Sequence, residues 1–224
     1  MIRNHVKISL RNLSKHRLFT AIKLTGLTVG IAACLLIGLY LQHELAYDGF
    51  HEKADRIMRV TMEYRNAGET QVVGVTGNKV VPSFRRDFPE VESGVRINQF
   101  TQVVRYADRL FEEENFYYAD STFFDIFSFP LLAGNPKTAL NAPKQVVLTA
   151  RMAQKYFGDQ DPLGKILKVG STGEYLVSGV MADPPTNSHL QPDFIGSLVS
   201  GVEPRGQRLG VNLLFAALLV VVGG

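Results

Sequence analysis

The stretch Leu24–Gln42, LTGLTVGIAACLLIGLYLQ, is nineteen residues long and contains no charged side chain. A helix of this length rises roughly 28 Å, close to the roughly 30 Å hydrocarbon core of a bilayer. Only a helix or a closed barrel satisfies every backbone N–H and C=O group in lipid. The sequence therefore predicts a single transmembrane helix, which we place at residues 18–42.

The charges on either side of this helix predict its orientation. Six cations precede Leu24, and the first acid of the chain, Glu44, follows Gln42. The cations are Arg3, Lys7, Arg11, Lys15, Arg17 and Lys23. By the positive-inside rule the N-terminus is cytoplasmic and the residues after about 43 are exported. Ile31–Cys34 has the composition of a lipoprotein cleavage box, but LLIGLYL follows it where a cleaved protein has a polar tether, so we favour an uncleaved anchor.

The positive charge of the chain is confined to its N-terminal end. The whole protein of 224 residues has a formal net charge of +3, with 24 Lys+Arg and 21 Asp+Glu. Without the six leading cations, 18 Lys+Arg face 21 Asp+Glu, which leaves the exported part at −3. This distribution favours a lipid surface as the partner of the basic end and argues against nucleic acid. The one cysteine, Cys34, lies in the anchor, so the exported part contains no disulfide.

Two stripes of residues predict contacts of the arm and of the anchor. Residues 1–17 form a basic amphipathic arm in which Arg3, Lys7, Arg11 and Lys15 recur every four residues beside apolar positions. Such a helix lies in the membrane surface, either as a simple flank of the anchor or as a contact helix that also touches a partner. In the anchor, the small residues Gly26, Gly30, Cys34 and Gly38 are also spaced by four and predict close packing against another helix.

The exported region, residues 43–198, predicts an α+β domain. Glu44–Arg59 is interpreted as a short amphipathic helical segment, with Glu52–Arg56 and Asp55–Arg59 as i,i+4 pairs. Strands are predicted at Ile57–Tyr64, Gln71–Val75, Val91–Tyr106, Leu110–Tyr118, Val146–Leu148, Ile166–Val169 and Tyr175–Val180. A helix is predicted from Val80 to Phe88, and a second from Ala150 to Phe157, capped by Thr149 and ended by Gly158. The phenylalanines 123, 124, 127 and 129 are predicted to fill a core.

Motifs for catalysis or for cofactor binding are absent from the sequence. Gly158–Lys165 resembles a phosphate-binding loop, but its glycines are one residue too far apart and Ile166 replaces the Ser or Thr that binds magnesium. His43 and His51 lie near acidic residues without an HExxH spacing, and the stretch from Asp183 to Asp193 is typical of a turn. We therefore predict no catalytic, cofactor or metal site and a binding or mechanical role.

Several motifs taken together resemble a known family, the permease subunits of MacB-like (FtsX-like) ABC transporters with their MacB-like periplasmic core domain. The resemblance spans roughly residues 1–198. It is carried by RNLSKHRLFTAIKLTGLTVGIAACLLI, YDGFHEKADRIMRV, FPEVESGVRI, FYYADSTFFDIFSFPLLAGNP, VVLTARMAQKYFGDQDPLGKILKV and VSGVMADPPTNSHL, in that order.

The resemblance implies a mechanical role in a bacterial inner membrane. A separate ATPase subunit dimerises on ATP in the cytoplasm, and the membrane helices carry the motion to the periplasmic domain, which expels a substrate or drives a partner. On this reading Arg3, Lys7, Arg11, Lys15 and Arg17 face the ATPase side and the membrane surface. The partners implied are an ABC ATPase subunit, the lipid bilayer, a second permease copy in a dimer, and a periplasmic adaptor or other envelope partner.

Residues 199–224 depart from the family pattern. Family members continue through more periplasmic sequence into further membrane helices, whereas here a polar bridge leads to Val211–Val222, which is too short to span a bilayer comfortably. The segment is interpreted as the start of a second helix or as the tail of a fragment. The leading hypothesis is thus part of an ABC export permease. The rivals are a mechanotransmitter that acts on an envelope enzyme or lipoprotein, and a single-pass anchored binding domain with no ATPase.

Overall fold

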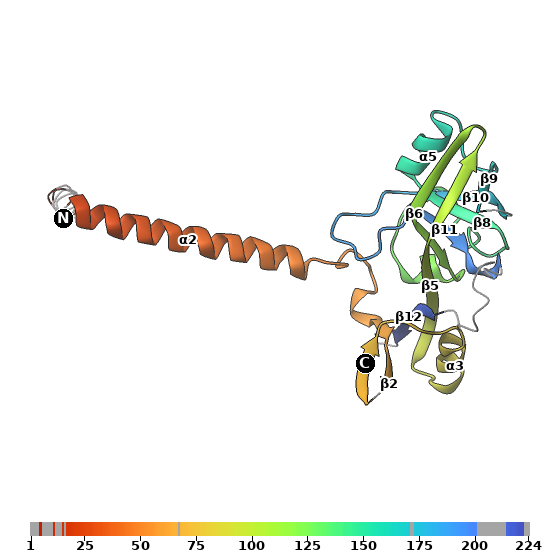
Figure 1. The fold of residues 1–224 in the computed structure, drawn as a ribbon, viewed down its shortest axis with the longest axis horizontal. Helices are drawn as coiled ribbons and strands as arrows, with labels where there is room; N and C mark the ends of the chain where they lie inside the picture. Colours follow the sequence, from red (N-terminus) through yellow and green to blue (C-terminus); the bar gives the residue numbers. More distant parts are fainter. Residues whose placement is uncertain are drawn as a thin grey trace. The chain divides into compact units, whose positions relative to one another are not determined.

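A computed structural model of the chain describes residues 5, 11, 15, 17–66, 68–170, 173–200 and 214–221. The chain divides into two compact units, residues 1–47 and residues 48–224, and each is described by itself. The first unit contains the helix α2 (Arg17–Leu45), and the second contains the mixed helix and sheet domain (Figure 1). The predicted α+β class is confirmed.

Helix α2 is long and apolar enough to cross a membrane. Its 29 residues rise roughly 43 Å, more than the roughly 30 Å of hydrocarbon, so the polar residues at its ends extend past the apolar part. None of its side chains is buried in the structure. An apolar surface of this size is stable only against lipid or other helices, which agrees with the predicted anchor.

The central feature of the domain is a ring of six paired strands. In order of pairing they are β5 (Val91–Tyr106), β6 (Arg109–Ala119), β11 (Phe194–Ser197), β8 (Gln145–Thr149), β10 (Gly173–Met181) and β9 (Ile166–Val169). Strand β9 then pairs with β5 through Val104–Val169 and Arg105–Lys168, which closes the ring. Most pairs are antiparallel, but β11 with β6 and β10 with β8 are parallel.

Alternate residues of the same strands supply two separate cores. In β8 and β11, Val147 and Ile195 belong to one cluster, while Val146, Leu148 and Phe194 belong to the other. Successive side chains of a strand point to opposite faces, so both faces of this sheet are covered. The first core contains the predicted phenylalanines: 123, 127 and 129 are buried and 124 is half-buried. The second contains α5 (Ala150–Phe157), capped by Thr149 and ended by Gly158 at a φ of 61°, as predicted.

The apolar C-terminal segment is a strand and not the start of a second membrane helix. Strand β12 (Leu214–Val221) pairs on one side with β5 and on the other with β1 (Ile57–Val60) and β4 (Thr76–Gly77). A short and uniformly apolar run is compatible with a strand as well as with a helix, and the sequence pattern alone does not distinguish the two. The preceding bridge, residues 201–213, lies outside the described residues.

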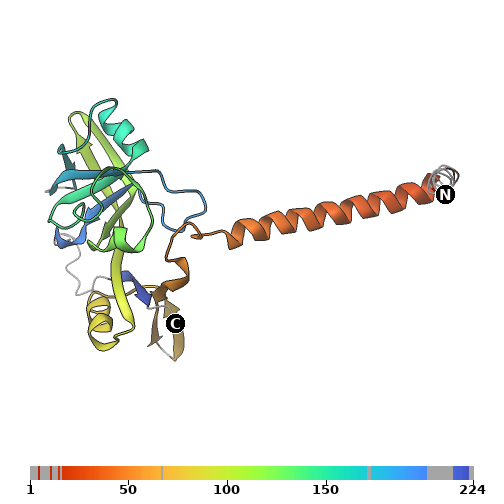
Figure 2. The same cartoon turned by 180° about the vertical axis from the view of Figure 1, so that it is seen from behind.

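Strand β5 belongs to two parts of the domain. Its first residues pair with β12 beside α3 (Val80–Asp87), and its later residues pair with β6 in the ring. Both views show β5 running from the part that holds α3 and β12 toward the part that holds α5 (Figures 1 and 2). Ala107 and Asp108, which lie between two of the predicted strands, form the turn that joins β5 to β6.

The segment after the anchor was wrongly predicted as an amphipathic helix. Residues 46–53 form turns, the 3-10 helix η1 covers only Ala54–Arg56, and β1 begins at Ile57. Arg56 pairs with Glu92 of β5 and not with Glu52. The remaining elements are β2 (Met62–Asn66), β3 (Glu69–Val73), α4 (Phe123–Ile126), β7 (Leu131–Gly134) and η2 (Leu198–Ser200). Strands β2 and β3 form a separate hairpin.

Candidate functional site: the junction after the anchor and an arginine-lined cleft

The small residues predicted to pack against other helices have open surroundings on α2. A Cβ atom built at Gly26, Gly30 or Gly38 meets nothing within 4 Å, and the free Cys34 is exposed. Arg11, Lys15 and Arg17 are also exposed, whereas Arg3 and Lys7 lie outside the described residues. The predicted helix contact therefore stays a prediction.

The junction begins at Asp48, three residues after the end of α2. Its backbone N–H donates to the carbonyl of Asn187 at 2.9 Å, and its φ of 55° lies in the left-handed region that Asp tolerates better than most residues. Its carboxylate accepts from the Ser188 hydroxyl at 3.2 Å and from the His189 backbone N–H at 3.0 Å, and lies 2.7 Å from His189 Nδ1. The entry of the chain into the domain is thus held by the 187–189 turn.

The charge of Asp48 is stabilised by these contacts. Partial burial by itself raises the pKa of the Asp48 carboxyl, but the hydrogen bonds from the His189 backbone and ring, the charge of the ring and the Ser188 hydroxyl together lower this pKa. Because the pair is partly exposed, its direct effect on the free energy of unfolding is small. The main effect of the pair is to hold Asp48 in place shortly after the end of the anchor.

A second attachment follows at His51, which is only 5% exposed. Its Nδ1 accepts the backbone N–H of Ser128 at 3.1 Å, and its ring meets Phe50, Phe127 and Phe129 at centroid distances of 3.9, 5.0 and 5.2 Å. Burial lowers the pKa of His51, although the nearby charge of Asp48 acts in the opposite direction. The neutral ring is therefore the form that fits this site.

Two further contacts extend the junction. The backbone N–H of Glu52 donates to the Ser128 hydroxyl at 2.9 Å, and Lys53 Nζ donates to the carbonyl of Asp125 at 2.6 Å. These contacts join the junction, residues 48–53, to the segment that contains the phenylalanines 123, 124, 127 and 129. No pattern in the sequence indicated this role for the segment, because partners more than 70 residues apart share no local pattern.

The stretch from Asp183 to Asp193, predicted as a turn, is held from its other side by α5. Asp183 accepts the backbone N–H of Arg151 at 3.2 Å, and the buried carboxylate of Asp193 pairs with the Arg151 guanidinium, with Nε 2.8 Å from Oδ1. Asn115 donates to the other oxygen of Asp193 at 3.3 Å. Ser188 and His189 are thus positioned for Asp48 by a braced loop, and the described contacts give them no arrangement as a catalytic triad with Asp183 or Asp193.

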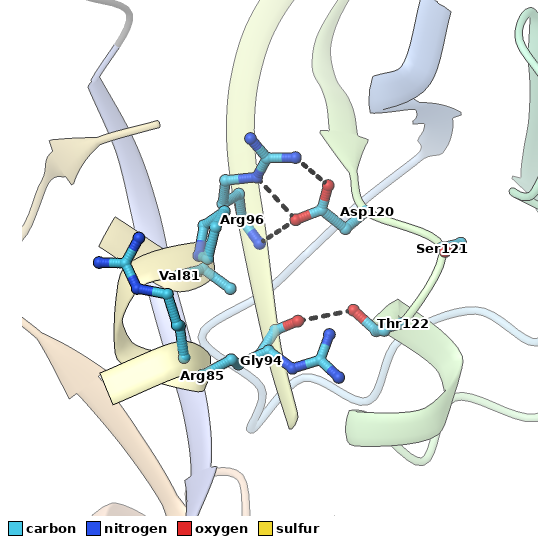
Figure 3. Close-up of a pocket in the computed structure, with 9 residues that line it drawn as sticks. Val81, Arg85, Gly94, Arg96, Asp120, Ser121 and Thr122 are labelled. Atoms are coloured by element: carbon cyan, nitrogen blue, oxygen red, sulfur yellow. Dashed lines mark hydrogen bonds and ion pairs between the residues drawn. The ribbon is translucent and has the colours of Figure 1, made fainter. Parts of the chain in front are cut away.

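A cleft of about 480 Å³ lies between α3, the start of β5 and the end of β6 (Figure 3). Its lining includes three arginines, 85, 86 and 96, and one acid, Asp120. Arg96 forms a two-point pair with Asp120, at 2.8 Å from Nε to Oδ2 and 2.6 Å from Nη2 to Oδ1, and its own backbone N–H donates to the same carboxylate at 2.9 Å. No motif in the sequence indicated this cleft.

Comparison with known proteins identifies the family of the domain. A family model described as the MacB-like periplasmic core domain matches residues 20–213. No curated protein matches the chain. Among solved structures, the chain is similar to a domain described as that of a permease protein from Porphyromonas gingivalis, with 26% identity and a TM-score of 0.65 over 78% of this chain and 76% of that one.

Two further structures share the fold. The periplasmic region of MacB from Actinobacillus actinomycetemcomitans has 14% identity and a TM-score of 0.54, over 75% of each chain. The extracellular domain of the noncanonic ABC-type transporter YknZ from Gram-positive bacteria has 17% identity and a TM-score of 0.50, over 67% of this chain and 74% of that one. The family match covers most of the chain, including all six strands of the ring, and ends just before β12. The chain therefore belongs to the family of the MacB-like periplasmic core domain, found in ABC-type permeases.

Proposed function

We propose that this chain is part of the permease subunit of an ABC-type export system in a bacterial inner membrane. Its N-terminal arm lies in the cytoplasm, α2 crosses the membrane, and the domain from residue 48 onward lies in the periplasm. A separate ATPase subunit supplies the energy, and this chain transmits the resulting motion and hydrolyses no ATP itself. A second copy of the permease completes the assembly.

The observation that carries this proposal is the junction at residues 48–53. Shortly after the end of α2, four residues form hydrogen bonds with the rest of the domain: Asp48, His51, Glu52 and Lys53. A flexible linker in this place would absorb a displacement of the helix, whereas several fixed points pass it on. An anchor that only tethers a binding domain has no need of such a junction.

The surface of α2 supports a role within an assembly. Its Gly26, Gly30, Cys34 and Gly38 leave space for another helix to approach, and its basic end suits anionic lipid and the ATPase side. Substitution of Gly26 and Gly30 by Leu is expected to reduce co-purification with the second copy. Retained assembly in this variant would contradict the packing role.

The proposal is tested on the full chain reconstituted in nanodiscs with its ATPase subunit. In a Cys34→Ser background, a spin label is attached at Gln154→Cys, an exposed position on α5. We expect ATP to change the distance distribution between the labels of two copies. A six-residue Gly-Ser insertion after Ala46 should abolish this change while ATP hydrolysis continues.

The same insertion in the exposed β5–β6 turn, between Ala107 and Asp108, is the matched control and should leave the ATP response intact. A response that survives the insertion after Ala46 would show that the junction transmits nothing. If no ATPase subunit co-purifies with the native chain, the anchored binding domain replaces the permease as the better account.

A further inference from the structure

We propose that the cleft between α3 and the end of β6 binds a phosphate oxyanion. Charged groups of both signs line this cleft. Arg96 and Asp120 hold each other through two side-chain hydrogen bonds, so their charges compensate. Asp120 also accepts the backbone N–H of Arg96, which leaves this carboxylate engaged by three donors. The pair forms a fixed and nearly neutral wall.

The remaining charge of the cleft is positive. Among the residues that the structure describes, the Arg85 guanidinium group has no hydrogen-bond or ion-pair partner, and this side chain is exposed. Within the described part of the chain, Arg86 pairs with its neighbour Asp87, and both side chains are largely exposed at 74% and 49%. An exposed pair of this kind is weak and exchanges readily for a better acceptor. Two guanidinium groups are therefore available in a domain whose formal net charge is −3 from residue 44 onward.

The shape of the cleft suits a small anion with an attached group. Its volume of about 480 Å³ falls within the roughly 300–1,000 Å³ of small-molecule sites. Figure 3 shows Arg85 on one side of Val81, with Asp120, Ser121 and Thr122 on the other. Val81 and Pro82 form an apolar wall, while Ser121 brings a hydroxyl group. The Thr122 hydroxyl donates to the carbonyl of Gly94 at 2.7 Å, and this bond holds two lining residues of the cleft together.

The placement of the donors favours phosphate over carboxylate. Arg85 and Arg86 belong to the last turn of α3, whereas Ser121 lies on the other side of the cleft, after the end of β6 (Figure 3). A tetrahedral oxyanion accepts hydrogen bonds from several directions, and the planar fork of arginine matches its oxygens. The phosphate group can come from a free small molecule or from a lipid headgroup, and the experiment distinguishes the two.

The test uses the full chain in nanodiscs of phosphatidylcholine, which carry no net charge. Calorimetric titrations are made with inorganic phosphate and, separately, with monomeric dihexanoyl phosphatidylglycerol. We expect saturable binding of at least one probe, weakened at least about tenfold in the double variant Arg85→Gln and Arg86→Gln, because charge-assisted bonds are lost. Both residues are exposed, so this variant should remain folded.

The matched control is Arg105→Gln, which removes one exposed cation from the outer part of β5 and should leave binding unchanged. Binding of phosphate alone identifies a free anion as the ligand, and binding of the lipid probe alone identifies a headgroup. Absence of binding by either probe overturns the proposal. Equal affinity in the wild type and the double variant also overturns it, since the basic N-terminal arm is the same in both.

Discussion

His51 is a single residue whose protonation should be visible in the stability of the whole domain. Burial lowers its pKa below the ordinary value of about 6.5, so the folded state prefers the neutral ring. The stabilisation from this residue is therefore complete above the pKa of the unfolded chain. It is lost as the pH falls through the lower pKa of the folded state.

We expect the thermal unfolding midpoint of the full chain to fall between pH 7.5 and 5, and the fall to be smaller in His51→Asn. Asparagine does not titrate in this range, and its amide oxygen can still accept the Ser128 N–H. Unfolding of both proteins in the same nanodiscs, followed by near-ultraviolet circular dichroism, provides the measurement. Equal slopes against pH would show that His51 is not the residue responsible.

Residues whose role is local could be predicted from the sequence, and those whose partners are distant could not. Thr149 as a helix cap and the buried phenylalanines follow from neighbours within a few positions, and both are confirmed. The contact of Asp48 with His189 joins residues 141 positions apart, and the pair of Arg96 and Asp120 joins residues 24 apart. Only the fold brings these groups together, so the junction and the cleft were both missed.

At the scale of single elements, two glycines with positive φ allow the cost of backbone strain to be measured apart from the cost of a steric clash. Gly134 at the end of β7 has a φ of 94°, and an added Cβ atom would lie 2.5 Å from the Ser178 carbonyl oxygen. Gly158 after α5 has a φ of 61° and open space around the same position. A side chain at either residue is strained, but only the first also displaces the neighbouring strand β10.

We expect Gly158→Ala to reduce the free energy of unfolding by about 1–3 kcal/mol, the cost of an unfavourable backbone conformation. Gly134→Ala should cost about 1–3 kcal/mol more, because the close contact forces β7 and β10 apart. Denaturant unfolding of the two variants beside the wild type measures both. Equal losses would mean that β7 moves freely away from β10.

Most elements with a clear pattern or a capping signal were predicted well, whereas the pattern of two segments was misleading. The strands β5, β6, β9 and β10 and the helices α3 and α5 agree with the structure to within a few residues. The segment after the anchor has charge pairs at helical spacing, yet its contacts with Ser128 and Asp125 hold it in turns. Strand β12 is uniformly apolar, so only its pairing partners distinguish it from a helix.

At the scale of the whole molecule, β12 is expected to support one part of the domain and not the other. Deletion of residues 214–221 removes the strand between β1 and β5, whereas the six-stranded ring keeps all its pairings. Hydrogen exchange of the full and the truncated chain should show lost protection at Ile57–Val60 and Val91–Ile97. Amides of β8 and β11 should stay protected from exchange. Loss of this protection in the truncated chain would show that the domain unfolds as one unit.

The pairing of β1 with β12 also imposes an order on folding. Ile57 pairs with Val220, so the first strand to leave the ribosome waits for a partner that is made 163 residues later. The ring, by contrast, needs nothing beyond Ser197. Contacts between such distant positions form slowly, because a long loop must close before they contribute. A nascent chain thus carries a finished ring joined to an exposed and unpaired β1, and this interval is when chaperones or wrong strand pairing can act on it.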